Sequence, residues 1–201
     1  MTSAKILQTL AIVRDETNDL MASKECLEQS LKLRKKKLGA NDLAVAESLY
    51  AYGCLLQKLG EQNESISTLE EAFRIRKSKL GMKNLLTAET LYQIGDIFLK
   101  QKEYEKAHVC FEQVLSARDK LLSPEHLQVV MCLKHLGMIC SELRRYDESI
   151  SFLSKALSIN EKESVLELAD LGPLMHSLGR SYFKLTRYEE ASEMHMKGTY
   201  F

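Results

Sequence analysis

The sequence has no tryptophan, only two prolines and no excess of charge of either sign. Lys and Arg number 28, as do Asp and Glu, so no net charge attracts nucleic acid or an anionic membrane. No run approaches the ~20 apolar residues of a membrane helix, and no secretory apolar core follows the amino terminus. Few prolines and glycines argue against many short β-strands. We therefore expect a soluble, mostly helical, cytoplasmic protein without nucleic-acid binding or membrane insertion.

Motifs for catalysis and for tight metal binding are also missing. The five cysteines are odd in number and form no Cys-x-x-Cys pair, which argues against a disulfide framework or a zinc site. The five histidines occur singly, although His135 and His176 could approach one another on neighbouring helices. No phosphate-binding glycine loop, His-Glu-x-x-His or Gly-x-Ser-x-Gly motif is present. The sequence therefore predicts a protein that is not an enzyme and has no cofactor and no metal.

A repeat of 42 residues organises the chain. Gly53, Gly95, Gly137 and Gly179 lie at this interval, and one step earlier is Ala11. Twelve residues after each of these positions the side chain is small. Sixteen residues after them stand Leu27, Leu69, Phe111, Leu153 and His195, apolar in four of five cases. Because glycine inside a helix costs roughly 1 kcal/mol, the column indicates close approach of a neighbouring helix.

Each repeat therefore reads as two antiparallel helices joined by a sharp turn. Turns are expected at 59–61, 101–103, 143–145 and 186–188. The second helices are expected to end at Leu38-Gly39, Leu80-Gly81 and Leu122-Ser123-Pro124, because glycine and proline stop helices. The predicted hairpins span about 1–39, 40–81, 82–123, 124–164 and 165–201 of a single domain, 1–201.

Two local features carry separate expectations. The basic run Arg34–Lys37 is interpreted as positive charge that complements a helix dipole. Pro173 is expected to delay or kink the first helix of the last hairpin.

The repeat resembles the tetratricopeptide repeat. The residues that match its pattern best are Leu91, Ile94, Gly95, Phe98, Tyr104, Ala107 and Phe111. The 42-residue period is similar to the kinesin light chain and nephrocystin type, and residues 122–130 resemble the motif between repeats of that type. The resemblance implies an all-α, right-handed superhelix, a solenoid of about five hairpins whose first helices form a concave wall.

In that family the ligand-facing positions lie three and two residues before the small column, and one, four and five after it. Carried over, they imply a peptide-binding wall that includes Tyr50, Tyr92, Gln93, Asp96, Leu99, Lys134, His135, Met138, His176, Arg180 and Lys184. The basic members gather toward the carboxyl end, which favours a ligand with acidic residues.

The predicted function is a non-catalytic scaffold or adaptor that binds a peptide or partner helix. A solvated helix face without a ligand is the simpler explanation of the same charges. A second alternative is a structural segment that self-associates into a homo-oligomer, because Tyr182, Phe183, Tyr200 and Phe201 leave the last hairpin without a polar cap. A third is a regulatory module of a larger multidomain signalling protein.

Overall fold

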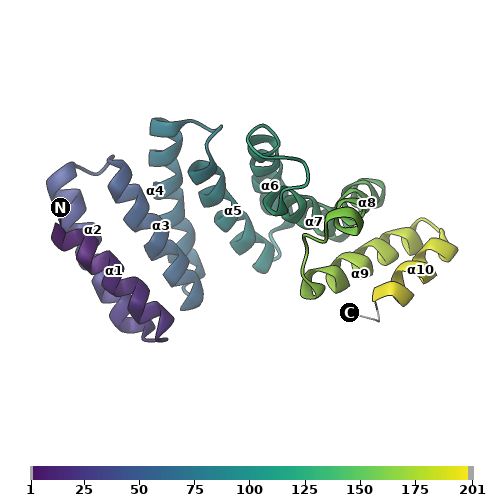
Figure 1. Cartoon of the computed structure of the whole chain (residues 1–201), viewed down its shortest axis with the longest axis horizontal. Coiled ribbons are helices and arrows are strands. Elements are labelled where there is room, and N and C mark those ends of the chain that lie inside the picture. Colours follow the sequence, from purple (N-terminus) through teal and green to yellow (C-terminus); the bar gives the residue numbers. More distant parts are fainter. Residues whose placement is uncertain (1, 199–201) are drawn as a thin grey trace. The chain divides into compact units, whose positions relative to one another are not determined.

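The computed structural model describes residues 2–198, except for the side chains of Thr2 and Leu168. Within these residues the chain forms ten α-helices and no strand (Figure 1). The helices are α1 (Thr2–Glu16), α2 (Leu20–Leu38), α3 (Leu43–Lys58), α4 (Gln62–Leu80), α5 (Leu85–Lys100), α6 (Tyr104–Arg118), α7 (Leu127–Glu142), α8 (Tyr146–Glu163), α9 (Leu168–Lys184) and α10 (Tyr188–Gly198). The predicted all-α fold is confirmed.

The chain divides into two compact units, Met1–Ile97 and Phe98–Phe201, each described here by itself. In the first unit α1 packs against α2 and α3 against α4, and α2 also contacts α3. In the second unit α7 packs against α8 and α9 against α10, with further contacts of α6 to α7 and of α8 to α9 (Figure 1). Consecutive helices thus form hairpins, as predicted. No described helix combines the length and apolar character needed to cross a bilayer.

The small column lies where the two helices of a hairpin meet. A Cβ added to Gly53 would stand 2.6 Å from Cγ of Leu69, and one added to Gly137 would collide with Leu153. At Gly179 the same position meets the ring of His195 at 3.0 Å. Each glycine therefore makes room for the side chain sixteen residues later. The predicted close approach of helices is confirmed at these three crossings.

The turn inside each hairpin contains one residue with a left-handed backbone. These residues are Asn18, Gly60, Lys102, Arg144 and Thr186, with φ between 60° and 81°, again at intervals of 42. The predicted turns are confirmed, although only one of the five residues is the glycine that this conformation favours. Gly39 and Gly81, at φ 83° and 80°, end α2 and α4 at the predicted places.

One predicted helix end was wrong, and one of the two effects expected of Pro173, a delayed start of its helix, does not occur. Helix α6 ends at Arg118 instead of Leu122, because the backbone N–H groups of Leu121 and Leu122 both turn back to the carbonyl of Arg118. Helix α9 begins at Leu168, so Pro173 lies inside it and does not delay its start.

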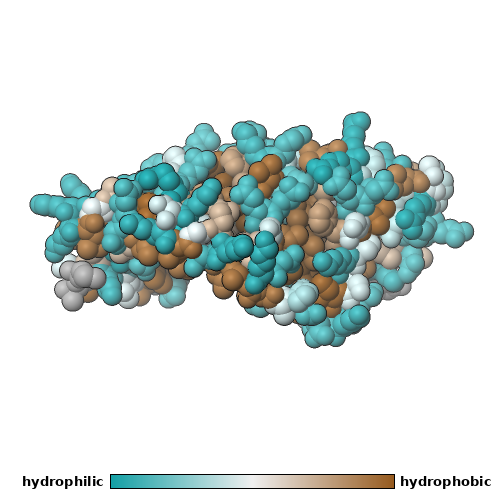
Figure 2. All heavy atoms as spheres, turned by 90° about the horizontal axis from the view of Figure 1, so that it is seen from above, coloured by the Kyte–Doolittle hydropathy of each residue, from teal (hydrophilic) through white to brown (hydrophobic). Residues whose placement is uncertain are grey.

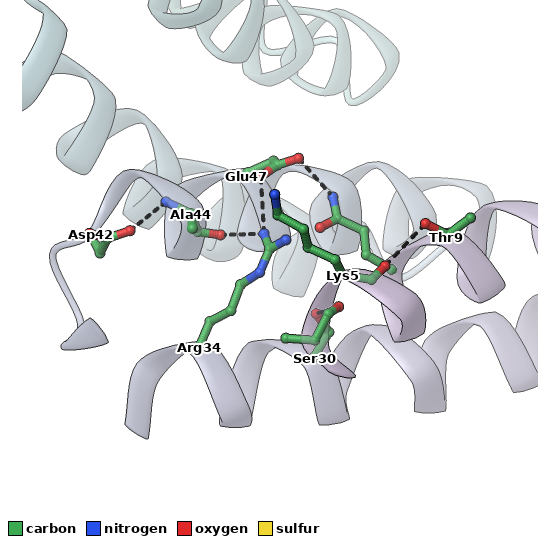
Figure 3. A network of polar contacts seen from close by, with 9 residues as sticks. Lys5, Thr9, Ser30, Arg34, Asp42, Ala44 and Glu47 are labelled. Carbon is green, nitrogen blue, oxygen red and sulfur yellow. Dashed lines mark hydrogen bonds and ion pairs between the residues drawn. The ribbon is translucent and has the colours of Figure 1, made fainter. Parts of the chain in front are cut away.

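A column of buried arginines ties each of the first three hairpins to the hairpin that follows it. Arg34 Nη1 donates to the carbonyl oxygen of Ala44 at 2.6 Å, and it also contacts Glu47 (Figure 3). Arg76 and Arg118 repeat the bond, at 2.9 Å to Leu86 and 3.0 Å to Gln128, and the three arginines are at most 5% exposed. Arg34 is therefore a buried cation and more than a positive charge near the end of α2. Its guanidinium joins two hairpins because a buried cation needs fixed acceptors.

The core of each unit lies both within its hairpins and between them. In the first unit Leu27 of α2 clusters with Tyr52, Leu55 and Leu56 of α3. In the second unit one apolar cluster extends from Val129 in α7 to Met194 in α10. Helices α3, α7 and α9 thus each pack against the helix that precedes them.

Candidate functional site

The predicted ligand-facing residues lie on one side of the first helices of the hairpins, which are α1, α3, α5, α7 and α9. In each unit we call this side the first-helix face. In the first unit its polar side chains bond from one hairpin to the next. Tyr50 Oη donates to Glu89 at 3.3 Å and Gln57 Nε2 donates to Asp96 at 2.7 Å, each across 39 residues. Gln8 and Glu47 are joined at the same spacing. Direct bonds between neighbouring first helices therefore fix this face.

Tyr50 is the most constrained of the predicted ligand residues. The Arg76 guanidinium lies 4.6 Å from the centre of its ring, which is a cation–π contact. Burial is the main reason that the pKa of Tyr50 is raised well above its ordinary value. Burial likewise raises the pKa of the neighbouring Cys54 thiol to about 11. Both groups are therefore neutral near pH 7, and the acidic group at this point is Glu89, which accepts from Tyr50.

Tyr92, Gln93, Asp96 and Leu99 follow on α5, and all four are half-buried. Gln93 Nε2 donates to Glu89 at 3.3 Å, so Glu89 receives both Tyr50 and Gln93. Asp96 accepts from Gln57. A ligand on α5 would meet partly covered aromatic and apolar surface rather than open charges.

In the second unit the predicted basic residues differ in accessibility. Lys134 is only 6% exposed and forms an ion pair with Asp170 of α9. Arg180 is half-buried; its guanidinium contacts the Ser141 hydroxyl at 2.9 Å and pairs with Glu142 at 2.6 Å. Lys184 is exposed. Lys134 therefore stabilises the helix pair, whereas Arg180 and Lys184 reach solvent.

A hollow lies between the ends of α7 and α9 and the turn that follows α7. It has a volume of about 520 Å³ and is lined by Ser141, Glu142, Arg144, Tyr146, Arg180 and Lys184. Three of the six lining side chains are cationic and one is anionic. Arg144 enters the site because its left-handed backbone turns the chain there, with φ at 62°. The hollow is therefore a basic, partly enclosed recess, which we call the basic hollow.

The histidines and Met138 complete the predicted set. His135 is half-buried, with its ring centre 4.9 Å from that of Phe111, and Met138 is half-buried beside the apolar cluster of the second unit. His176 is exposed and its ring centre lies 5.6 Å from that of His195. Each histidine thus packs against a ring of the preceding or following second helix. On the face seen in Figure 2, polar and apolar side chains are interspersed.

Sequence reasoning missed the acidic partners and Arg144. Glu47 and Glu89 lie 42 residues apart, so the repeat carried a signal for them, but their column stands six residues before the small one and outside the family's ligand-facing positions. Arg144 sits in a turn and follows no helical pattern. The bond between Arg180 and Ser141 spans 39 residues, as do the pairs of the first unit, and this spacing could have located it.

Comparison with known proteins places these features in a family. A family model described as tetratricopeptide repeat matches residues 2–78 and 86–162, more than half of the chain. Among curated proteins no significant match is found.

Solved structures resemble the chain in fold. A protein described as a kinesin light chain from Podosopora anserina, with nearly identical TPR-like repeats, has a TM-score of 0.79 at 19% identity, over 97% of this chain and 92% of that one. BtubC from P. vanneervenii has a TM-score of 0.82 at 18% identity, over 96% and 77%. MamA from Desulfovibrio magneticus RS-1 has a TM-score of 0.75 at 18% identity, over 99% and 94%. The chain belongs to the tetratricopeptide-repeat family.

Proposed function

We propose that this chain is a non-catalytic, cytoplasmic protein-interaction module that binds an acidic segment of a partner, with a carboxylate in the basic hollow of the second unit. Tetratricopeptide-repeat proteins generally bind protein partners, which supports the general role. The basic hollow is the observation that carries the finer proposal, since it gathers Arg144, Arg180 and Lys184 around about 520 Å³. Charge-assisted hydrogen bonds from guanidinium to carboxylate are strong and directional.

The neighbouring half-buried groups supply the apolar part of the contact. Tyr146 lines the hollow itself, and Met138 lies one helical turn before Ser141 on α7. A rigid aromatic side chain beside a charged recess is a common anchor in protein interfaces. The expected ligand therefore carries an acidic residue next to an apolar one.

The test measures binding of a fluorescent, glutamate-rich peptide to the full chain by anisotropy. The double variant Arg144→Glu with Lys184→Glu is expected to lower the affinity at least about tenfold, since hydrogen bonds to charged groups contribute about 1.5–3 kcal/mol each. Raising the ionic strength is expected to weaken binding by the wild type more than by the variant.

Lys102→Glu is the matched control. Lys102 is exposed and occupies the same left-handed turn position as Arg144, one repeat earlier, so its reversal changes the net charge by as much as Arg144→Glu does alone. It is expected to leave the affinity within about twofold, because exposed charges interact weakly. Lys134→Glu is unsuitable, because it would bury a repulsive pair with Asp170. Equal affinities of the wild type and the double variant would refute the electrostatic part of the proposal.

A second candidate function, homotypic stacking, is favoured by the exposed side of α1. Ile6, Leu10 and Val13 form a stripe there, all at least 40% exposed. Their equivalents 42 residues later are the buried Ser48, Tyr52 and Leu55 of α3. Because Tyr52 and Leu55 pack on Leu27 of α2, the stripe is shaped to receive another second helix.

The described carboxyl-terminal helix offers a matching surface. Tyr188 of α10 is 59% exposed, and its equivalent four repeats earlier is Leu20, which packs against α3. Phe183 is also exposed, whereas Tyr200 and Phe201 lie outside the described residues. Head-to-tail contacts of this kind generate open chains of copies.

Sedimentation velocity over a range of concentrations tests stacking. Self-association is expected to grow with concentration in the wild type and to disappear in Leu10→Glu. Glu163→Gln, on the exposed end of α8, is the control. A wild type that stays monomeric throughout would overturn this second candidate and leave the peptide proposal untouched.

A further inference from the structure

Three side chains that ligate metals meet within the second unit. They are His108 on α6, Cys140 on α7 and Glu148 on α8, and one ligand atom from each lies within 4.8 Å of the others. His108 and Cys140 are buried, while Glu148 opens the cluster to solvent. Imidazole, thiolate and carboxylate are the ligands that Zn²⁺ accepts in proteins. The residues are at least eight positions apart, so no short motif revealed them.

The two ring nitrogens of His108 face different partners, one of which can only donate a hydrogen bond. Nδ1 lies 3.4 Å from a carboxylate oxygen of Glu112, and Nε2 lies 3.3 Å from Nη1 of Arg145. A guanidinium can only donate, so Nε2 is the acceptor and the proton sits on Nδ1 toward Glu112. Metal-binding histidines have this arrangement, in which a carboxylate holds the other ring nitrogen and fixes the tautomer.

The repeat does not require a histidine at this place. In the first unit the equivalent residues are Lys24 and Glu61, an ordinary ion pair at 2.6 Å that also spans 37 residues. In the second unit His108 and Arg145 take these positions. An imidazole facing a guanidinium gives no ion pair, so only a hydrogen bond joins the two hairpins where the first unit has a salt bridge.

The guanidinium of Arg145 occupies the position that a metal ion would take in the cluster. Its guanidinium contacts His108 and pairs with Glu148 through two nitrogens. Arg145 and Glu148 are each more than 40% exposed, so the pair is weakly held and the arginine can turn outward. One positive charge therefore already sits between two of the three ligands, where a metal ion would share the same partners.

We propose that His108, Cys140 and Glu148 bind one Zn²⁺ ion, which displaces Arg145 from the cluster. The metal would be held by Nε2 of His108, Sγ of Cys140 and a carboxylate oxygen of Glu148, with the fourth position open to water or to a side chain of a partner. Glu112 is a positioning residue, because it touches the imidazole and not the metal. Binding transfers the Cys140 thiol proton to solvent, since the thiolate is the ligand.

The test titrates the full chain with Co²⁺, a spectroscopic substitute for Zn²⁺. The wild type is expected to bind one equivalent with a near-ultraviolet thiolate-to-cobalt absorption that Zn²⁺ removes. Cys140→Ser is expected to abolish that absorption. Glu148→Gln changes an exposed side chain, so the fold should be kept. This variant is expected to bind Co²⁺ at least about tenfold more weakly, because losing even a residue that only hydrogen-bonds to a metal ligand has an effect of this size.

Two further variants separate a built site from a reactive thiol. Glu112→Gln is expected to weaken binding by about 10- to 100-fold while the thiolate absorption persists in the saturated protein. Arg145→Ala is expected to tighten binding by about two- to fivefold, because it removes a weakly held competing cation.

Cys132→Ser is the matched control, since Cys132 is equally buried on the same helix and is expected to have no effect on binding. The proposal is overturned if the wild type takes up no Co²⁺, if Cys132→Ser rather than Cys140→Ser removes the absorption, or if Glu148→Gln and Glu112→Gln bind as the wild type does.

Discussion

Two hydrogen-bonded pairs on the first-helix face occupy equivalent positions in the two units, yet their chemistry is opposite. In the first unit the Gln57 amide donates to the carboxylate of Asp96. In the second unit the Arg180 guanidinium donates to the hydroxyl of Ser141. Both pairs span 39 residues and join neighbouring first helices. The pair of the first unit thus holds an anion, whereas the pair of the second holds a cation that also pairs with Glu142 and borders the basic hollow.

The parts that hold the hairpins together are, in contrast, nearly the same in the two units. Gly53 receives Leu69 as Gly137 receives Leu153. Arg76 and Arg118 each donate to a carbonyl oxygen in the first turn of the following helix. The period of the repeat therefore decides where contacts between hairpins fall, and the side chains placed there decide what a face can bind. Changes to the shared parts should act alike in both units, and changes to the faces should not.

The largest effect is expected from the buried arginines. Arg76→Met and Arg118→Met should each lower the free energy of unfolding by about 2–3 kcal/mol, because each removes buried hydrogen bonds made by a charged group. Denaturant unfolding followed by circular dichroism measures the loss. Lys36→Met, at an exposed position of α2, should change stability by less than about 0.5 kcal/mol. A large loss in one unit with none in the other would break the comparison.

The glycine crossings are expected to come next. Gly53→Ala and Gly137→Ala should each destabilise the chain by about 1–3 kcal/mol, as overpacking does. Gly137→Ala should cost more, because its new methyl also meets the backbone nitrogen of residue 153 at 3.2 Å, whereas Gly53→Ala meets a side chain only. Gly172→Ala is the control, since nothing lies within 4 Å of its added Cβ. Because Gly172 precedes Pro173, and proline disfavours helical backbone at a preceding residue that carries a Cβ, the usual gain of alanine should be offset and stability should change by less than about 0.5 kcal/mol in the same unfolding experiment.

A smaller gain is expected at the left-handed turns. Thr186→Gly should raise the free energy of unfolding by about 0.5–1 kcal/mol, because a β-branched residue at φ 63° is strained. Lys102→Gly should gain less, since an unbranched side chain tolerates this conformation better. Gly60→Ala should lose stability for the same reason. An unchanged melting temperature of Gly60→Ala would contradict the strain that we expect at these turns.

The last effect is absent near pH 7 and concerns only alkaline pH in the first unit. Burial raises the pKa of Cys54 from its ordinary value of 9.0 to about 11, so the folded state keeps the thiol proton longer than the unfolded state does. The contribution to stability is fully present below the lower pKa and is lost as pH rises through the window between these values. Cys54→Ala should therefore show a shallower fall of stability with pH over this window. Parallel curves for the variant and the wild type would contradict the assignment.

The arrangement of the helices could be predicted from the sequence, because close packing of helices requires small and large residues at fixed spacings. Glycines at equal intervals located the helix crossings, and the size of the residue sixteen positions later agreed with the side chain found there. The left-handed turns were located from their place between helices, but their conformation was not visible in Lys102, Arg144 or Thr186. Geometry imposed by the flanking helices overrides residue preference at these positions.

The candidate site was only partly predictable, because charge says nothing about burial. Lys134 and Arg180 looked alike in the sequence, yet Asp170 neutralises the first in a buried pair while the second borders the basic hollow. Arg34 is one of four successive cations near the end of α2, and its sequence position gave no sign that it is buried. Each outcome depends on a partner from another hairpin, whose identity a single helical pattern does not contain.

The most direct measurement of the central claim follows backbone amide resonances of the full chain while a glutamate-rich peptide is added. We predict that the largest chemical-shift changes occur at residues 141–146 and 180–184 around the basic hollow. The resonances of residues 57–62, at the equivalent place in the first unit, should stay unchanged. Equal shifts in the two segments, or shifts confined to the first unit, would contradict this claim.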